Sequence, residues 1–458
     1  MAQDATAHAR TIRIGCGAGF SGDRVDPAED LARRGALDYL FFECLAERTL
    51  AAAHVGMAEG RPGHDPHLSR RLTPVLAPCR EAGTRILTNM GSADPMAGGE
   101  AAAEIARGLG LQGLRIAVVT GDDVAALLTP DMKLMDADGT LGEVGLPMIG
   151  ANAYLGAAPL VEGLAAGADL VITGRIADPA LALAPLIHEF GWGDADWSRL
   201  GAGTLVGHLL ECASQITGGY FADPGRKDVA GMAWLGYPLA EVGADGAAVI
   251  TKLPDTGGLV DRRTVLEQML YEVHDPAAYL TPDVTADFSG VEITQAGTDR
   301  VSVQGASGHA RPEGLKVTVG FAGGFLGEGE ISYAGPGAAA RARLAGEVIR
   351  TRMVELHGCQ DPIRVDLLGL GALLTPTEGA AAPDPDWEAQ APEVRLRVAV
   401  RSRSRELAET LAREAEALWC AGPAGGGGAR GRVTQSVVTR SVLIDRTRVR
   451  PQVKVITA

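Results

Sequence analysis

The sequence predicts an α/β protein with a mainly parallel sheet flanked by helices, an antiparallel middle section and a small α+β C-terminal domain. Three observations predict this class. Short apolar strands alternate with helix-length segments through the first two hundred residues, which is typical of a parallel sheet. Alternating strand patterns then dominate the middle of the chain. A stretch rich in Ala, Pro and Asp finally precedes a strand-helix-strand segment at the end.

The first part of the chain defines the parallel sheet. Expected strands cover residues 11–15, 38–44, 84–89, 114–120, 148–155 and 169–173. Expected helices between them cover 26–36, 99–109, 159–166 and 178–190. The spacing of these elements leaves open whether the sheet is open or closed into a barrel.

The remaining elements define the rest of the domain organisation. We expect a hairpin with Asp245-Gly246 at its turn, antiparallel strands over 288–321, helices over 264–274 and 337–358, and a strand over 363–368. The predicted domains are a core over 1–378 (parallel part about 11–200, mixed part about 201–378), a linker over 379–392 and a small domain over 393–458. The small domain reads as strand 393–400, helix 406–419, glycine-rich loop 422–428 and strand 433–444, which favours a ferredoxin-like fold.

Composition restricts the class of protein and its partners. The chain has 458 residues, of which 46% are hydrophobic and 22% charged, so it can bury a large core. No run approaches the ~18–20 apolar residues of a membrane span, and the start does not resemble a signal peptide. The cytoplasm is therefore the expected location. Six scattered cysteines indicate free thiols rather than disulfides.

The charge is unevenly distributed. The net charge of -15 disfavours nucleic acid and anionic membranes as partners. Residues 393–458 contain 13 Lys and Arg against 6 Asp and Glu, a net charge of +7, which leaves -22 on the residues before them. The basic end is expected to dock on the acidic body or to attract anions. We expect a small-molecule substrate and a homo-oligomer.

The segment 201–220 is the strongest candidate for a chemical site. Thr204 is expected to N-cap a helix on which His208, Glu211 and Gln215 share one face, because they are spaced by three and four residues. An imidazole beside a carboxylate predicts acid/base chemistry. The same pattern is also typical of a buried helix with a structural histidine. Residues that end this helix and are expected to line the site are Gly218, Gly219 and Tyr220.

The ends of the predicted strands offer further site residues. Ligands of parallel α/β sheets bind outside the carboxyl ends of the strands. Those ends carry Cys16, Glu43-Cys44, Asn89, Asp122, Asn152 and Arg175. This set of small and polar residues predicts a binding site at that edge of the sheet.

One glycine motif imitates a dinucleotide fingerprint. Gly17-x-Gly19-x-x-Gly22 matches it literally, and Glu43 follows at the expected distance. However, the helix is expected to start later, at Asp26, so the glycines do not open it as phosphate binding requires. We therefore predict no nicotinamide or flavin cofactor. Gly17 and Gly19 are kept as backbone lining of a substrate pocket, and a dinucleotide-dependent oxidoreductase stays as an alternative.

Four motifs resemble the acyclic terpene utilisation (AtuA) family. They are IRIGCGAGFSGDR near the start, TGRIADPALALAPLIHEFGW (173–192), GHLLECASQITGGYFADPG (207–225) and TVLEQMLYEVHDPAAYLTPDVTADF (264–288). The resemblance covers about residues 11–370, and the tail is similar to the AtuA-like C-terminal domain. It implies a setting in the catabolism of branched acyclic terpenes such as citronellol and geraniol, through acyl-CoA thioesters. It implies no particular reaction.

The first functional hypothesis is an enzyme that uses acid/base chemistry on a carboxylate or acyl-CoA substrate, as a hydratase/lyase or a hydrolase. His208 is the expected general acid or base, oriented by Glu211. Asn89 and Arg175 are expected to bind a carboxyl group or a developing oxyanion. The supporting candidates are Tyr220 and Asp283.

Three further alternatives remain open besides the oxidoreductase. Cys16 or Cys44 is a candidate nucleophile. A divalent metal held by His208, Glu211 and Asp283 is a second alternative, although no metal is predicted. The third is a non-catalytic binding or scaffolding subunit of a CoA-dependent pathway, with the basic tail as its partner surface.

Overall fold

The computed structural model describes residues 10–370, 372 and 390–458. The chain forms two compact units, Met1–Gly320 with Thr439–Ala458, and Phe321–Val438. These boundaries differ from the expected ones at 378 and 393. They differ because the strands β14 (Gly314–Ala334) and β17 (Gly427–Asp445) each contribute residues to both units. Most of the predicted linker, 379–389, lies outside the described residues.

The first unit is organised around a ten-stranded mixed sheet in the described part of the chain. Its order is β11-β12-β8-β7-β1-β2-β3-β6-β4-β18. The central strands β1 (Thr11–Cys16), β2 (Tyr39–Phe42), β3 (Arg85–Thr88), β6 (Leu170–Thr173) and β4 (Arg115–Thr120) are parallel. The outer strands β7 (Pro238–Gly243), β8 (Ala248–Lys252), β12 (Arg300–Gln304), β11 (Glu292–Gly297) and β18 (Gln452–Thr457) pair antiparallel. This confirms the α/β class, and the sheet is open because β11 and β18 are its edges.

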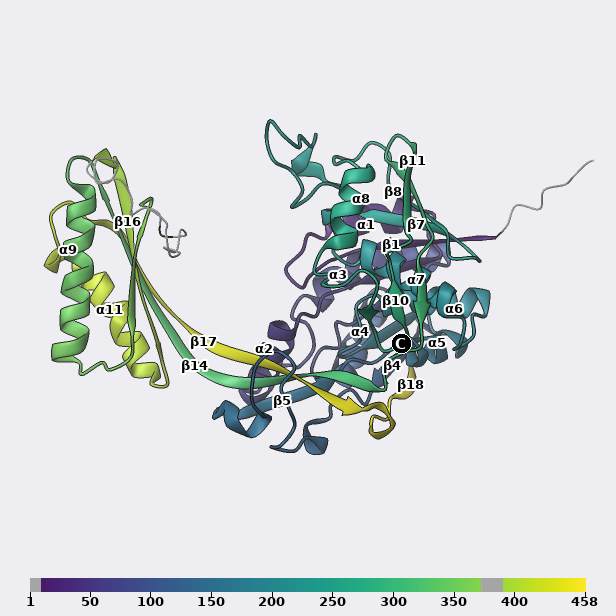
Figure 1. The fold of residues 1–458 in the computed structure, drawn as a ribbon, viewed down its shortest axis with the longest axis horizontal. Helices are drawn as coiled ribbons and strands as arrows, with labels where there is room; N and C mark the ends of the chain where they lie inside the picture. The colour runs from purple at the N-terminus through teal and green to yellow at the C-terminus, as the bar shows by residue number, and fades with distance from the viewer. Residues whose placement is uncertain (1–9, 371, 373–389) are drawn as a thin grey trace, which may run out of the picture. The chain divides into compact units, whose positions relative to one another are not determined.

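The central strands form because they are continuous apolar runs. All four residues of β2 and of β6 are buried, as expected for parallel strands covered on both faces. Neighbouring residues of β4 point to opposite faces of the sheet, so their contacts show what covers each face. A Cβ on Gly99 of α4 would meet Val118, whereas one on Gly163 of α5 would meet Ala117. Helices therefore pack on both faces of the sheet (Figure 1).

Most of the expected helices occur near their predicted positions. The first unit contains α1 (Asp26–Arg34), α2 (Glu47–Ala58), α3 (Leu68–Ala82), α4 (Pro95–Gly108), α5 (Ala158–Ala165), α6 (Ala180–Phe190), α7 (Trp197–Leu210) and α8 (Arg262–Leu270). Its smaller strands are β5 (Met148–Ala153), β9 (Tyr279–Leu280), β10 (Thr285–Asp287) and β13 (Ser307–His309). In the described part of the chain, we find no helix that combines the length and hydrophobicity needed to cross a membrane.

The extent predicted for the central helix was wrong at both ends. α7 begins at Trp197, so Thr204 lies buried inside the helix instead of capping it. The early start is possible because glycines let the helix approach its neighbours: a Cβ on Gly201 would lie 1.9 Å from the carbonyl oxygen of Ser307. The helix ends at Leu210, and Ala213 soon adopts a left-handed backbone with φ of 45°. His208 and Glu211 nevertheless stay adjacent.

The contact between α7 and β13 gives a stability prediction. Gly201→Ala should destabilise the protein by about 1–3 kcal/mol, because the added methyl group meets backbone atoms that cannot rotate away. Gly108→Ala is the matched control, since no heavy atom lies within 4 Å of the added Cβ. The control should raise stability by about 0.5–1 kcal/mol. Urea denaturation measures both changes. Equal stability of Gly201→Ala and the unchanged protein would contradict the close packing of α7.

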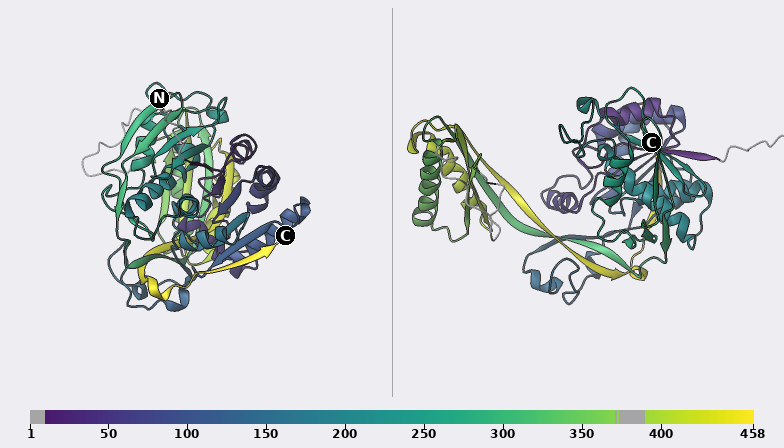
Figure 2. Two further views of the ribbon diagram at one scale, coloured as in Figure 1. Left: turned by 90° about the vertical axis from the view of Figure 1, so that its right-hand side faces the viewer. Right: turned by 45° about the horizontal axis from the view of Figure 1, so that its top comes forward.

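The second unit is an α+β sandwich. Its elements follow the order β14, α9 (Ala338–Thr351), β15 (Ile363–Leu368), β16 (Glu393–Ser402), α11 (Arg405–Ala421) and β17, and the sheet order is β15-β16-β14-β17. Both helices lie beside this sheet (Figure 2). Their buried residues share a core with alternate residues of β16. A separate ferredoxin-like domain within 393–458 is not confirmed. Those residues supply only part of this sheet, and β18 pairs with β4 of the first unit.

Candidate active site

The carboxyl ends of the parallel strands meet at one edge of the central sheet, and a buried polar network lies there. Glu43 follows β2 and Asn89 follows β3. The Asn89 side chain donates to Glu43 Oε1 at 2.9 Å and accepts from the Cys44 N–H at 2.8 Å. Glu43 Oε1 also accepts from the Leu45 N–H at 2.8 Å. Asn89 thus fixes the position of the Glu43 carboxyl group.

A second part of this network follows β4 and β6. Asp122 Oδ2 accepts from the Asn152 side chain at 2.9 Å and from the Arg175 N–H at 2.8 Å. Asn152 Oδ1 in turn lies 2.8 Å from His54 Nε2 on α2. These bonds join the segments that follow β4 and β6 with β5 and α2, and they tie the Arg175 backbone to the same edge.

Arg175 supplies the positive charge of the network. Its side chain is 1% exposed, and all three guanidinium nitrogens donate to the protein. The acceptors are the carbonyl oxygens of Leu45 and Ile176 and the carboxylate of Asp178. The guanidinium also lies 4.5 Å from the centre of the Tyr154 ring. In this arrangement Arg175 neutralises Asp178, whose side chain remains 37% exposed.

The structure brings His208 and Glu211 together at the end of α7. His208 Nδ1 lies 2.9 Å from Glu211 Oε1, and both side chains are buried. The imidazole packs against Tyr279 and Phe288, with ring centres 5.2 and 6.0 Å away. His208 Nε2 and Glu211 Oε2 are buried without a hydrogen-bond partner. Buried polar atoms without a partner are costly in a folded protein, so the pair is a candidate functional site.

The His208–Glu211 pair lies next to the strand-end network. Burial raises the pKa of Glu211, the hydrogen bond from His208 opposes that rise, and the negative charge of Asp178 adds to it. The Cys16 thiol, at the end of β1, lies 4.0 Å from the carbonyl oxygen of Glu211. One imidazole, several carboxyl groups and one buried guanidinium therefore occupy the same side of the sheet.

Glu43 stands out because its pKa is raised to about 8. The main cause is burial, and the charge of Asp178 adds to it, while Arg175 opposes it. A carboxylic acid with this pKa keeps its proton at neutral pH and can donate it. The sequence placed Glu43 at the end of a predicted strand, but nothing in its position along the chain indicated that it would act as a proton donor.

The raised pKa of Glu43 makes stability depend on pH. The pKa of Glu43 in the folded state lies above its unfolded value near 4.5. The free energy of unfolding therefore keeps its full value below pH 4.5 and falls as pH rises towards 8. The loss of unfolding free energy is at most about 5 kcal/mol, because each unit of difference between the two pKa values corresponds to about 1.4 kcal/mol. Glu43→Gln should remove most of this slope in urea denaturation measured between pH 5 and 9. An unchanged slope would contradict the buried neutral acid.

Several predicted site residues lie apart from the pair. The Asp283 carboxylate accepts from the Ala157 N–H before α5 at 2.9 Å, and its charged neighbours include Arg311 and Arg446. Burial raises the pKa of Asp283 to about 6. Among the described residues, no group of three or more His, Cys, Asp or Glu side chains is arranged to hold a metal ion. Burial raises the pKa of the Cys16 thiol well above its usual value, which disfavours a thiolate nucleophile.

The glycine-rich loop packs against the protein itself. A Cβ on Gly17 would lie 2.4 Å from Phe42, and one on Gly19 would lie 2.6 Å from the backbone of Cys212. Carbonyl oxygens of the loop accept hydrogen bonds from the buried guanidinium of Arg71. These bonds account for the path of the loop backbone. Gly19 donates its N–H to Asp23 at 2.9 Å. These contacts explain the glycines without a bound phosphate.

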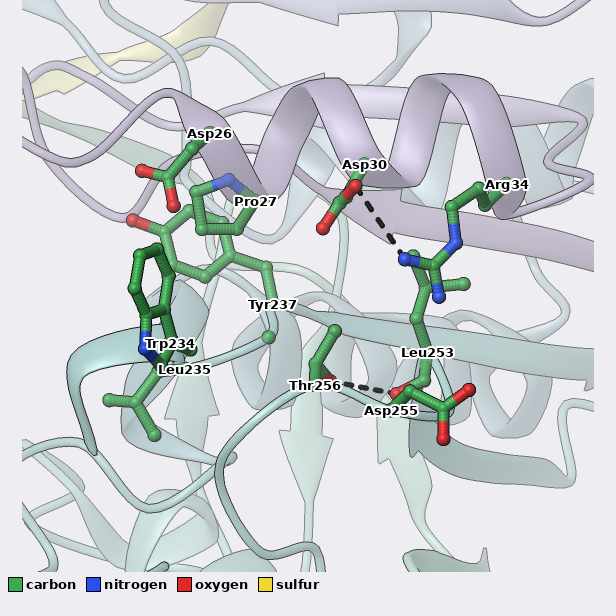
Figure 3. A pocket seen from close by; sticks show the side chains of 11 residues that line it. Asp26, Pro27, Asp30, Arg34, Trp234, Leu235, Tyr237, Leu253, Asp255 and Thr256 are labelled. Atoms are coloured by element: carbon green, nitrogen blue, oxygen red, sulfur yellow. Dashed lines mark hydrogen bonds and ion pairs between the residues drawn. The ribbon is translucent and has the colours of Figure 1, made fainter. Parts of the chain in front are cut away.

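A cavity of about 210 Å³ lies beside α1, after this loop (Figure 3). Asp26, Asp30 and Arg34 of α1 form one wall, and Trp234 and Tyr237 stand opposite. Two of its acidic side chains are paired, since Arg34 lies 3.7 Å from Asp30 and Arg24 pairs with Asp26. Negative charge near the start of α1 disfavours a phosphate there.

The fold and the buried polar network define an α/β protein with a candidate acid/base site at the carboxyl edge of a parallel sheet. The chain belongs to the acyclic terpene utilisation family AtuA, whose family model matches residues 12–455. The match includes the basic C-terminal segment as well as the core. It indicates a role in acyclic terpene utilisation. No curated protein and no solved structure matched the chain.

Proposed function

We propose that this protein is an enzyme of terpenoid or branched-acyl metabolism that adds water to, or removes it from, a carboxylate or thioester substrate by acid/base catalysis. The observation that carries the proposal is the buried His208–Glu211 pair, in which Nε2 and Oε2 have no partner. A histidine with one nitrogen held by a carboxylate and the other one free is suited to proton transfer.

The roles follow from the hydrogen bonds. Glu211 accepts the Nδ1 proton of His208 and so leaves Nε2 as the nitrogen that takes or gives the substrate proton. Glu43, with its raised pKa, is the second proton donor. Arg175 does not take the expected role of binding a substrate carboxyl group or oxyanion, because all its guanidinium nitrogens donate to Leu45, Ile176 and Asp178; its role is to hold Asp178 in place. Asn89 positions Glu43.

Thioester substrates provide the first test. The purified protein is incubated with branched β-hydroxyacyl and α,β-unsaturated acyl thioesters and with the free acids. Mass spectrometry then detects products that differ by one water. The proposal expects such a product with at least one branched substrate, and more slowly with a straight-chain analogue. Products that instead differ by two hydrogens would contradict it, because they would indicate redox chemistry.

A further inference from the structure

A second cavity, of about 240 Å³, lies beside the turn that follows α7. Its aromatic side chains are Tyr220, Phe221 and Tyr271, and Gln268 of α8 also lines it. We call this cavity the aromatic chamber. It is separate from the strand-end network and adjoins the His208–Glu211 pair through Gln268.

Gln268 gives the chamber its polar group. Its side chain is 3% exposed, and its Nε2 donates to the backbone carbonyl of His208 at 3.1 Å. Its Oε1 is buried and has no hydrogen-bond partner. A buried acceptor left without a donor costs about 1–3 kcal/mol. A ligand with one O–H or N–H group would remove this cost.

Tyr220 gives the chamber an exposed aromatic wall. Its side chain is 88% exposed and its backbone φ is 59°, a left-handed conformation that is unfavourable for tyrosine. Such strain costs on the order of 1–3 kcal/mol and is found mainly at functional sites. The Tyr220 ring meets Tyr271 edge to face, with centres 6.4 Å apart. The two rings offer faces to a flat group.

The third ring is held by cations. Lys227 Nζ lies 4.8 Å and Arg263 Cζ lies 5.5 Å from the centre of the Phe221 ring. Lys227 is also paired with Glu267, which lines the chamber. These contacts fix the wall formed by Phe221. The lining also includes Gln215, Thr264 and Glu267, and among these side chains Gln268 carries the acceptor that is buried without a partner.

We propose that the aromatic chamber binds a small, flat, mostly apolar group that carries one hydrogen-bond donor, with the donor directed to Gln268 Oε1. Tyr220 and Tyr271 contact the faces or edges of that group. The proposal does not depend on acid/base catalysis by His208, because it rests on Gln268 and on the aromatic rings.

Two matched probes test the proposal. We would titrate the full-length protein with 4-fluorophenol and with 4-fluoroanisole and follow ¹⁹F NMR line widths. The probes have similar shape, but only the phenol can donate. We expect the phenol to bind about tenfold more tightly, as one hydrogen bond predicts. Equal affinity of the two probes, or binding of neither at millimolar concentration, would overturn the proposal.

Variants locate the binding. Gln268→Leu should abolish the preference for the phenol, whereas Gln360→Leu, at an exposed position of the second unit, should keep it. Tyr220→Gly should weaken binding of both probes and raise Tm, because it removes the ring and the strained backbone together. A raised Tm with unchanged binding would show that Tyr220 is no part of the chamber. His208→Asn should retain probe binding, which separates this proposal from the catalytic one.

Discussion

Replacing His208 by asparagine is expected to lower turnover by about 10²–10⁴-fold, the usual contribution of a general acid or base. Asparagine retains a side-chain N–H that can reach Glu211, so the buried carboxylate keeps a donor. The nitrogen that we assign to proton transfer, Nε2, is lost. The measurement is kcat/KM for the substrate found in the mass-spectrometric test.

The control separates catalysis from folding. His309→Asn changes an exposed histidine of the same unit and should leave kcat/KM within twofold. Circular dichroism and Tm should show that His208→Asn remains folded. A folded His208→Asn variant with full activity would refute the role of the imidazole.

Replacing Arg175 by methionine should have the largest effect on stability. The substitution removes the cation that faces Asp178 and the nearby carboxyl group of Glu43. Breaking a buried ion pair costs about 3–5 kcal/mol, and we expect about 3 kcal/mol, because part of the Asp178 side chain reaches solvent. Urea denaturation at pH 7 measures this loss.

Two variants sharpen this test. The double variant Arg175→Met with Asp178→Asn should recover part of the lost stability, since it removes the unpaired charge. Arg33→Met breaks an exposed i,i+4 pair with Glu29 and should change stability by less than about 1 kcal/mol. A loss for Arg175→Met no greater than that for Arg33→Met would contradict the central place of Arg175 in the network.

The sequence was informative where local pattern decides the structure. The parallel strands were predictable because β2 and β6 are short, continuous apolar runs. The unit boundaries were not, because β14 and β17 continue through both units and no break in composition marks that continuity. The N-terminus of α7 was missed because Thr204 has a side chain suited to capping, whereas tertiary packing of Gly201 extends the helix.

The candidate site divides in the same way. The His208–Glu211 contact followed from a spacing of three residues on one helix. Tyr279 and Gln268 come from a segment some sixty to seventy residues later, and only tertiary folding brings them against α7. Asp283 lies in that same segment but faces Ala157. Its chemistry was suitable for the site, but its direction could not be read from sequence.

Isotope uptake from water tests the central claim most directly. Branched thioesters and acids are incubated with the protein in water labelled with both deuterium and ¹⁸O, and mass spectrometry follows the label in the recovered compounds. Hydration places solvent deuterium on carbon and ¹⁸O in the new hydroxyl group, and hydrolysis places ¹⁸O in the new carboxyl group. Reversible elimination exchanges the abstracted hydrogen of the substrate for deuterium. We predict uptake with the unchanged protein and its loss in His208→Asn. Equal uptake by both proteins would contradict acid/base catalysis by the His208–Glu211 pair.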